Sequence, residues 1–340
     1  MKDVAIITNS LSGGGAERAM NLLADSLSKF SELTVLLIAI NSGNKDLVEP
    51  ECLVVEIRRK WKGSVWDSIR SFLRFQITLL KFKPQCLVLN CDLPEFYSAF
   101  AFWSGKCVIV EHTTKPWVKR RTLGRIVRFI LKLRGASWIR VSERIPLNFG
   151  FAVQATIPNI VNPDVLLVNS RNYQSDASPG KLVFVGRLSN EKRPDLFVEL
   201  ARKTGIASIV IGDGVLLPSL LAETNNLASI EFLGQRKNPW ECVSPNDLVV
   251  ITSDYEGDCL VALEAAIIGV PVALRNIPDL SAIGFPLNNY FENISDLTKR
   301  INDLNFKSFL MDDSQKKKIL AGRSAEEVSL KWLSFIHDHR

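Results

Sequence analysis

The sequence is poor in metal-binding residues and in signals that direct a chain into a membrane. Its three histidines are His112, His337 and His339, and the last two lie near the C-terminus, so we expect no catalytic metal site. The six cysteines form no Cys-x-x-Cys pair and lie mostly in apolar runs, which is typical of buried thiols in a reducing compartment. The apolar runs are strand-sized, shorter than the roughly 20 residues of a membrane helix. No signal-peptide core follows Met1, and we expect a cytosolic protein.

The glycine-rich turn near the N-terminus matches neither of two common nucleotide motifs. Residues 4–8 predict a strand and residues 16–30 a helix, with Gly13, Gly14 and Gly15 between them. No Gly-Lys-Ser/Thr follows, and the spacing is not Gly-x-Gly-x-x-Gly, which disfavours ATP and NAD. A backbone without side chains can still approach a phosphate or a sugar closely, and helix N–H groups can donate to it. A ligand-free turn is the alternative.

Length and charge indicate two different halves. The 340 residues, 46% of them hydrophobic, exceed one ordinary core and predict two domains. Residues 1–165 carry 23 Lys and Arg against 14 Asp and Glu, whereas the remainder carries 19 against 22. We expect a connector at residues 157–163 and an exposed loop at residues 169–180.

The most informative spacing is that of two glutamates, Glu256 and Glu264. Residues 247–252 predict a buried strand, residues 260–268 a helix and residues 270–274 another strand. Ligands of such sheets bind beyond the carboxyl ends of the strands, which is where Glu256 lies. A carboxylate accepts two hydrogen bonds from a sugar diol, so the pair suits a nucleotide-linked sugar. Two solvated surface carboxylates are the alternative.

Two cations follow another predicted strand. Gly186 and Arg187 end the strand, and Lys192 follows within one loop. An Arg fork and a Lys point charge suit a diphosphate leaving group, although a solvated turn would look the same. Gly212 forms a second tight turn after a strand at residues 208–211, and a third strand ends similarly at Gln235.

These segments resemble the retaining glycosyltransferase family 4 over nearly the whole chain. The matching stretches are Gly-Gly-Gly-Ala-Glu-Arg at 13–18, Glu-His-Thr at 111–113, Ile-Pro-Asn at 157–159, Gly-Arg-Leu at 186–188 with Lys192, Gly-Asp-Gly at 212–214, and Glu256 with Glu264. The resemblance implies an α/β protein with the GT-B fold, in which two Rossmann-like, doubly wound parallel-sheet domains face a cleft. We expect an acceptor domain at 1–160, joined by a C-terminal helix at about 329–340, and a donor domain at 161–328.

The resemblance also implies roles for individual residues. Arg187 and Lys192 neutralise the donor diphosphate, Glu256 contacts the transferred sugar, Glu264 binds the ribose, and His112 lies near the reacting sugar. Gly14 and Gly15 face the diphosphate from the opposite domain. The further residues expected at the donor are Gly186, Gly212, Gln235, Gly257, Asp258, Cys259, Leu260 and Val261. The family implies no metal.

One position departs from the family pattern. Many relatives have Gly-Phe-Gly after the first glutamate, where this chain has Gly257, Asp258 and Cys259. The extra carboxylate of Asp258 would alter hydrogen bonding to sugar hydroxyls, so the identity of the donor sugar does not carry over from relatives.

A basic segment without any acidic residue follows the His112 motif. Residues 115–134 interleave cations with apolar residues at helical spacing, which is typical of helices that lie on an anionic bilayer or bind a phosphorylated acceptor. The residues assigned to acceptor or membrane are Lys115, Trp117, Lys119, Arg120, Arg121, Arg125 and Arg128. A second candidate spans residues 60–83. An ordinary helix with one buried face is the alternative.

The sequence therefore predicts transfer of a hexose or N-acetylhexosamine from a nucleoside diphosphate sugar, favoured as a UDP-sugar, with retention of configuration. The expected acceptor is a membrane-associated glycan such as a polyprenyl-diphosphate-linked oligosaccharide, which would place the enzyme on the inner membrane face. A GT-B nucleotide-sugar epimerase and a basic nucleic-acid-binding protein are the alternatives. No recognised nucleic-acid module supports the latter.

Overall fold

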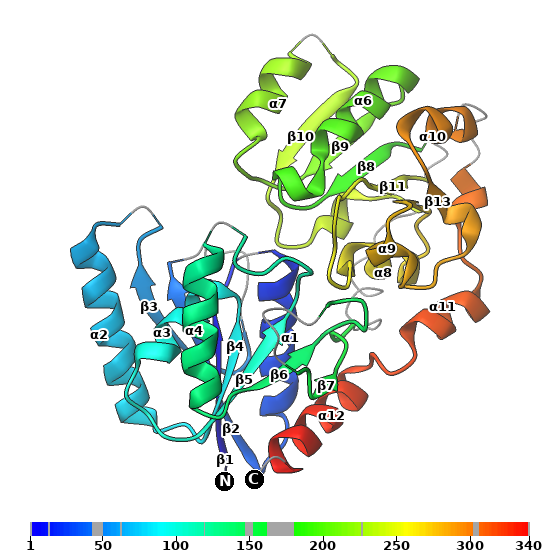
Figure 1. Ribbon diagram of the computed structural model, residues 1–340. Helices are drawn as coiled ribbons and strands as arrows, with labels where there is room; N and C mark the ends of the chain where they lie inside the picture. The colour runs from blue at the N-terminus through cyan, green and yellow to red at the C-terminus, as the bar shows by residue number, and fades with distance from the viewer. Residues whose placement is uncertain are drawn as a thin grey trace. The chain divides into compact units, whose positions relative to one another are not determined.

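The computed structural model describes residues 2–12, 14–42, 50–61, 63–118, 120–146, 152–161, 180–225, 227–301 and 306–338 (Figure 1). The chain divides into two compact units. Unit 1 comprises Met1–Ile160 and Gly322–Arg340, and unit 2 comprises Val161–Ala321. The return to unit 1 thus comes earlier than residue 329, where the sequence placed it. The predicted connector is described only to residue 161, and the predicted loop at 169–180 lies, except for Gly180, outside the described residues.

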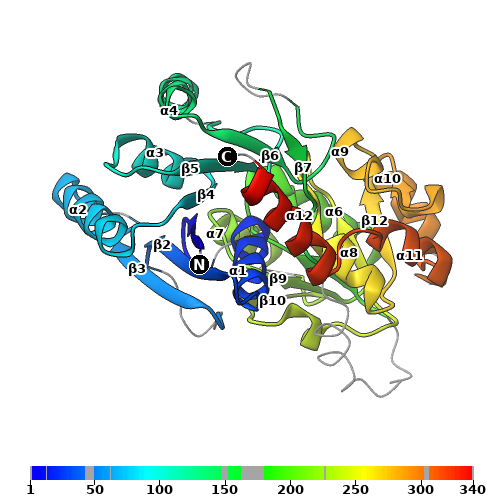
Figure 2. The same cartoon turned by 90° about the horizontal axis from the view of Figure 1, so that it is seen from below.

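Unit 1 is built on a parallel sheet in the order β3-β2-β1-β4-β5-β6-β7. Its strands are β1 (Lys2–Thr8), β2 (Leu33–Asn41), β3 (Leu53–Arg59), β4 (Cys86–Asn90), β5 (Lys106–Glu111), β6 (Ser137–Arg140) and β7 (Ala155–Thr156). Its helices are α1 (Gly15–Ser28), α2 (Val65–Phe82), α3 (Asp92–Phe100), α4 (Arg121–Leu133) and α12 (Ala325–Asp338). Figure 2 shows α2, α3 and α4 along one face of this sheet and α1 with α12 along the other. The central strands are covered on both faces and read as continuous apolar runs for that reason.

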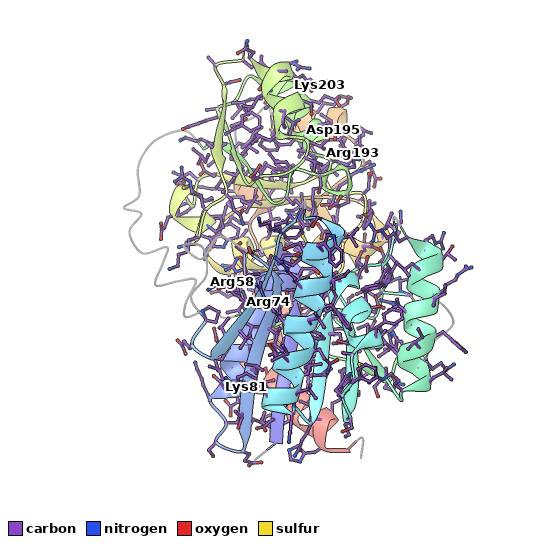
Figure 3. The ribbon with its side chains drawn as sticks, turned by 90° about the vertical axis from the view of Figure 1, so that its left-hand side faces the viewer. Arg58, Arg74, Lys81, Arg193, Asp195 and Lys203 are labelled. Carbon is purple, nitrogen blue, oxygen red and sulfur yellow. The ribbon has the colours of Figure 1, made fainter. Side chains whose placement is uncertain are left out.

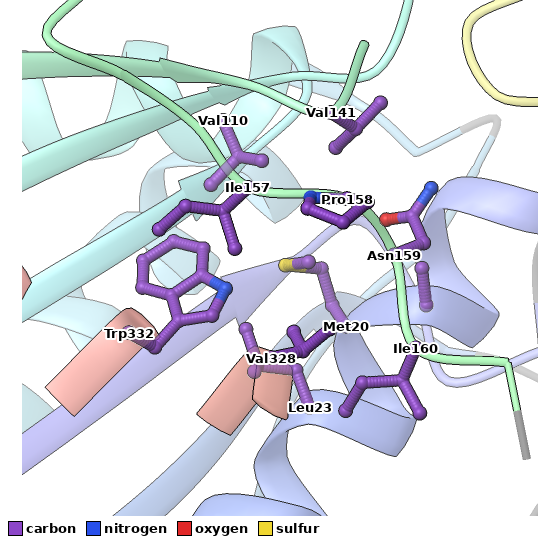
Figure 4. Close-up of a pocket in the computed structure, with 11 residues that line it drawn as sticks. Met20, Leu23, Val110, Val141, Ile157, Pro158, Asn159, Ile160, Val328 and Trp332 are labelled. Atoms are coloured by element: carbon purple, nitrogen blue, oxygen red, sulfur yellow. The ribbon is translucent and has the colours of Figure 1, made fainter. Parts of the chain in front are cut away.

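Helix α12 is held on unit 1 by contacts with α1 and the sheet. The hydroxyl groups of Ser26 and Ser329 are 2.7 Å apart, and Lys106 donates to the carbonyl of Ile336 at 2.9 Å. A small apolar pocket lies where α1, α12 and the segment after β7 meet (Figure 4). Met20 and Trp332 line it from the two helices. The chain end is therefore part of the packing of unit 1.

Unit 2 repeats the design with a six-stranded parallel sheet in the order β10-β9-β8-β11-β12-β13. Its strands are β8 (Leu182–Val185), β9 (Ser208–Ile211), β10 (Ile230–Gly234), β11 (Leu248–Ile251), β12 (Val272–Arg275) and β13 (Tyr290–Phe291). Its helices are α6 (Pro194–Thr204), α7 (Leu217–Thr224), α8 (Leu260–Ile267), α9 (Pro278–Ser281), α10 (Ile294–Ile301) and α11 (Asp313–Leu320). Leu182, Val250 and Phe197 belong to its buried core.

In both sheets the strand order reverses once. The reversal lies between β1 and β4 in unit 1 and between β8 and β11 in unit 2. At such a point neighbouring loops leave the sheet in opposite directions, which opens a crevice beyond the carboxyl ends of the strands. Among the helices that the structure describes, none combines the length and apolar character needed to cross a membrane.

Candidate functional site

The loops after β8 and β11 bring one cation and one carboxylate of unit 2 together. Lys192 Nζ lies 2.6 Å from Glu256 Oε1, although the two residues are 64 positions apart. The lysine side chain is 30% exposed and that of the glutamate 9%. Desolvation lowers the pKa of Lys192, but the charge of Glu256, the hydrogen bond to it and electrostatic interactions with Cys259 and Glu191 together outweigh desolvation, and the net pKa is raised. Lys192 is therefore cationic at neutral pH, at an edge that solvent reaches.

Buried hydroxyl groups position this pair. Ser253 donates to the same Oε1 of Glu256 at 2.7 Å. Thr252 donates to the carbonyls of Lys192 and Arg193 at 2.8 and 2.9 Å, which ties the β8 loop to the end of β11. Both hydroxyl residues are at most 2% exposed. Hydrogen bonds formed without access to water leave little freedom, so the geometry is set before any ligand arrives.

The backbone of Glu256 is held by a residue that follows a third strand, β12. Its N–H donates to Asp279 Oδ2 at 3.0 Å, and Asp279 lies on α9 just after β12. Nearby, Arg275 and Arg193 both pair with Asp254, whose N–H donates to the carbonyl of Glu191 at 2.9 Å. The loops after β8, β11 and β12 thus form one connected layer.

The glycines of the β8 and β9 turns are required by close backbone contact at Gly212 and Gly214 and by a positive φ at Gly186. A Cβ on Gly212 would lie 1.9 Å from the carbonyl oxygen of Gly186, and one on Gly214 would lie 2.3 Å from that of Leu188. Gly186 and Gly212 also have positive φ angles of 156° and 150°. The backbone N–H groups of Gly186 and Gly212 donate sideways, to Ile211 and Gly234. The β9 turn therefore packs closely against the β8 loop, which also carries Lys192.

Glu264 is held by an indole that the sequence did not single out. Trp240 Nε1 donates to Glu264 Oε2 at 2.8 Å, and the tryptophan is 0% exposed. Glu264 itself is 4% exposed and lies in α8. A buried carboxylate needs such a donor, and the indole N–H fixes the direction in which the carboxylate points.

The departure at residues 257–259 lies at the start of α8. Asp258 and Cys259 are buried, and Cys259 has a left-handed backbone with φ 35° and ψ 61°. Burial and the carboxylate of Glu256 raise the pKa of the Cys259 thiol, which is therefore protonated. A non-glycine residue in this conformation is uncommon and marks a tightly constrained turn. Leu260 and Val261 follow as the first residues of the helix.

In unit 2, Arg187 and Gln235 are the exposed members of the predicted donor set. Arg187 follows Gly186 in the β8 loop, and Gln235 follows β10. The structure thus brings Lys192 and Glu256 together and leaves the side chains of Arg187 and Gln235 open to solvent.

In unit 1, a side chain of the following helix, α1, already binds the glycine turn after β1. The N–H of Gly14 donates to Glu17 Oε2 at 2.9 Å, and this contact caps α1. Gly15 is exposed, with nothing within 4 Å of a built Cβ, and Gly13 lies outside the described residues. An anion at this helix start would have to compete with Glu17 for the N–H of Gly14.

His112 lies directly after β5, with its Nε2 buried. No hydrogen-bond partner of Nε2 is found within the described part of the chain. Burial lowers the pKa of His112 to about 4, so the ring is neutral at physiological pH. A buried, unpartnered ring nitrogen is available to a ligand, because it has already lost its contact with water.

Trp117 and Arg128 lie inside unit 1, which corrects their assignment to an acceptor or membrane surface. Arg128 is 1% exposed, donates to Glu95 at 2.6 and 2.8 Å and pairs with Glu111. The Trp117 indole also donates to Glu95, at 2.8 Å. Arg128 belongs to the interior because α4 turns one face toward α3 and β5, and Trp117, in the loop before α4, packs against Gly124 of that helix. Helical spacing alone does not reveal which cations lie on that face.

The other residues of the basic segment are placed differently. Lys115, Arg120, Arg121 and Arg125 are exposed, and Lys119 lies outside the described residues. Burial and the charge of Glu95 raise the pKa of Asp92, beside this network, to about 6, against the opposing effects of the Trp117 N–H and the charge of Arg128. The pKa of Glu111 is raised to about 7, chiefly by burial and against the opposing charge of Arg128.

In the described residues, no group of three or more His, Cys, Asp or Glu side chains is arranged to hold a metal ion. The six cysteines are free thiols. The candidate site in unit 2 therefore offers the cations Lys192 and Arg187 and two buried carboxylates, beside close-packed glycine turns.

The sequence profile of the glycosyl transferases group 1 matches residues 168–283, the segment that contains these loops. The chain is 34% identical over 123 residues to the O-antigen biosynthesis glycosyltransferase WbnH of Escherichia coli, a match covering 36% of this chain and 34% of the relative. It therefore spans about a third of that relative's length.

A longer match links the chain to a Campylobacter jejuni enzyme. The N-acetylgalactosamine-N,N'-diacetylbacillosaminyl-diphospho-undecaprenol 4-alpha-N-acetylgalactosaminyltransferase is 26% identical over 291 residues, and the match covers 78% of each chain. Among solved structures, Anabaena Alr3699/HepE in complex with UDP and glucose superposes with a TM-score of 0.78 at 16% identity, over 99% of this chain and 100% of that one. Sucrose-phosphate synthase from Thermosynechococcus elongatus gives 0.76 at 17%, over 98% of each. The predicted GT-B fold is confirmed.

Proposed function

We propose that the chain is a retaining glycosyltransferase that moves a hexose or N-acetylhexosamine from a UDP-sugar to a hydroxyl of a membrane-associated glycan, such as a polyprenyl-diphosphate-linked oligosaccharide. The observation that carries this proposal is the Lys192–Glu256 pair, 2.6 Å apart at the point where the strand order of unit 2 reverses. Two close-packed glycine turns lie in the neighbouring loops.

In this proposal Lys192 and Arg187 stabilise the departing diphosphate. Negative charge grows on that group as the bond to the sugar breaks, and fixed cations oppose it without reorganisation. The raised pKa of Lys192 keeps the side chain charged throughout. Because side chains supply the positive charge, the proposal includes no divalent ion and no cofactor beyond the nucleotide sugar.

The two glutamates bind the sugars of the donor. Glu256 shares one oxygen between Lys192 and Ser253, and we assign it to the transferred sugar. Glu264, oriented by Trp240, is assigned to the ribose diol. Asp258 adds a buried carboxylate next to Glu256, so the transferred sugar would have hydroxyl or amide donors to match it.

The acceptor is assigned to unit 1, with His112 near the reacting sugar and Gly14 and Gly15 facing the diphosphate. A neutral, buried imidazole can accept or donate a hydrogen bond without adding charge. Retention of configuration follows from the resemblance to family 4.

The acceptor class is supported by the relatives. The Campylobacter jejuni enzyme is named for transfer to a diphospho-undecaprenol-linked sugar. The exposed Arg121 and Arg125 of α4 suit a diphosphate or an anionic headgroup. We accordingly propose a peripheral position on the cytoplasmic membrane face.

A panel of nucleotide sugars tests this function. Thermal unfolding is measured with each UDP-, GDP- and dTDP-sugar, and one donor should raise the midpoint above the others. That donor is then incubated with polyprenyl-diphosphate-linked acceptors, and release of UDP together with a product of retained anomeric configuration is expected.

Three outcomes contradict the proposal. Conversion of the sugar without any acceptor would indicate the epimerase. Salt-dependent RNA binding without release of UDP from any donor would favour the nucleic-acid alternative. A product of inverted configuration would remove the retaining mechanism while leaving transfer intact.

A further inference from the structure

Helix α2 turns an apolar face to solvent, which reverses the usual pattern of a surface helix. Its inner face buries Phe75 and Leu79 against unit 1. On the opposite face, apolar residues return every three or four positions, and Trp66 is 73% and Ile77 63% exposed. An ordinary helix is polar at these positions. The residues of this outward row are Trp66, Ile69, Leu73, Ile77 and Leu80.

The segment after α3 extends this surface. The Gln76 side chain donates to the carbonyl of Phe102 and accepts from its N–H, both at 2.7 Å. Phe102 is 80% exposed and is thereby fixed beside α2. We call the outward row together with Phe102 the α2 face. An apolar surface of this extent on a single domain usually marks an interaction site.

One flank of the α2 face is cationic. Arg70, Arg74 and Lys81 are four and seven positions apart, so they follow one side of the helix. Figure 3 shows Arg74 and Lys81 there, with Arg58 of β3 on the same side. The one acidic residue of the helix, Asp67, accepts a hydrogen bond from the backbone N–H of Lys60 and lies at the first turn.

Helix α4 has the same design on the same side of the sheet. Ile126, Phe129 and Leu133 are between 52% and 72% exposed, beside Arg121 and Arg125. Figure 2 shows α2 and α4 in one layer. Two helices of that layer therefore present apolar side chains beside cations, and α2 presents the longer row.

We propose that the α2 face inserts into the headgroup region of an anionic bilayer, with α2 lying parallel to the membrane plane. The apolar row would enter the acyl boundary, while Arg70, Arg74 and Lys81 would remain at the level of the lipid phosphates. This deepens the membrane contact proposed for α4, because it makes α2 the main apolar anchor. A second copy of the chain fits less well, since antiparallel two-fold pairing of this face would bring cationic flanks together.

Vesicle co-sedimentation of the full chain, without donor or acceptor, tests the proposal. The vesicles contain either phosphatidylcholine alone or equal parts of phosphatidylcholine and phosphatidylglycerol. The wild-type chain should bind the mixed vesicles, and the variant Trp66→Ser/Leu73→Ser/Ile77→Ser should bind them at least about tenfold more weakly. Because these side chains are exposed, the unfolding midpoint should stay unchanged.

Matched controls separate the apolar and the charge contributions. Val215→Ser/Leu221→Ser/Leu287→Ser removes three exposed apolar side chains of unit 2 and should bind like the wild type. Arg70→Gln/Arg74→Gln/Lys81→Gln should lose roughly fivefold per cation on the mixed vesicles.

Three results overturn the inference. The first is equal vesicle binding by the α2 variant and the wild type, and the second is wild-type binding to pure phosphatidylcholine as strong as to the mixture. The third is a dimer, seen by light scattering, that the α2 variant dissociates. Failure of the proposed function gives a different result: no UDP release on a detergent-dispersed acceptor by either chain, with vesicle binding unaffected.

Discussion

Two clusters of this molecule pair a cation with carboxylates, but one is sealed in the interior and the other is reached by solvent. In unit 1, Arg128 is sealed between Glu95 and Glu111 with about 1% of its side chain exposed. In unit 2, Lys192 meets Glu256 with 30% of the lysine side chain still reached by solvent. The first cluster joins α4 to α3 and β5, whereas the second lies where the strand order of unit 2 reverses, beyond the ends of β8 and β11. Burial, more than residue type, separates a structural cluster from a candidate binding site.

The largest expected effect comes from opening the buried cluster. Arg128→Ala should lower the free energy of unfolding by about 3–5 kcal/mol, because Glu95 and Glu111 are left buried without a counter-charge. Urea denaturation monitored by circular dichroism measures it. Arg125→Ala, an exposed cation of the same helix, is the control and should change stability by less than about 0.5 kcal/mol. Equal effects of the two changes would refute the structural role.

Changes in the exposed cluster should lower turnover and leave stability nearly unchanged. Arg187→Ala and Lys192→Ala should each lower turnover by about 100- to 1000-fold, since each removes a fixed cation from the leaving group. Steady-state UDP release measures it, and the unfolding midpoint should hardly change. Lys203→Ala, an exposed cation of α6 shown in Figure 3, is the control. Near-normal transfer by both variants would remove the proposed role.

A smaller effect is expected where Trp240 orients Glu264. Trp240→Phe keeps an aromatic ring but removes the indole N–H, and UDP binding should weaken about tenfold. Isothermal titration with UDP and with 2′,3′-dideoxyuridine diphosphate makes the comparison. Only the ligand with a ribose diol should respond. An equal loss for both ligands would mean that Trp240 acts through packing rather than through Glu264.

The smallest effect depends on pH. The pKa of Asp92 is raised from 3.8 to about 6, so its charge costs stability as pH rises through that interval. Asp92→Asn removes the cost and should stabilise the protein by about 1–2 kcal/mol above pH 6, with no gain below pH 3.8. Urea denaturation across this range measures it. A gain that does not vary with pH would point to a cause other than ionisation.

Much of unit 2 could be predicted because its signals are local. The strand predicted at 208–211 matches β9, and the helix predicted at 260–268 matches α8 to within one residue. The resemblance implied that Lys192 and Glu256 serve the same donor, although not that they pair directly, and close packing at Gly212 explains the glycine turn that the sequence displayed. Such features follow from apolar runs ended by glycine.

The supporting residues could not be predicted in the same way. Thr252 and Asp279 form hydrogen bonds with residues 23 to 60 positions away, and Trp240 lies 24 residues from its carboxylate. No spacing rule marks such partners. In the basic segment, the sequence showed an amphipathic helix but not that Arg128 lies on its buried side, because both sides carry cations.

The sequence by itself determined two parallel-sheet domains, the turns at their strand ends and the residue types available there, because these depend on local periodicity and on glycine. Only the tertiary structure decided which cations are buried, which carboxylate each one meets and which helices turn apolar faces outward. Those outcomes depend on contacts between segments distant in the chain, and local sequence patterns carry no record of them.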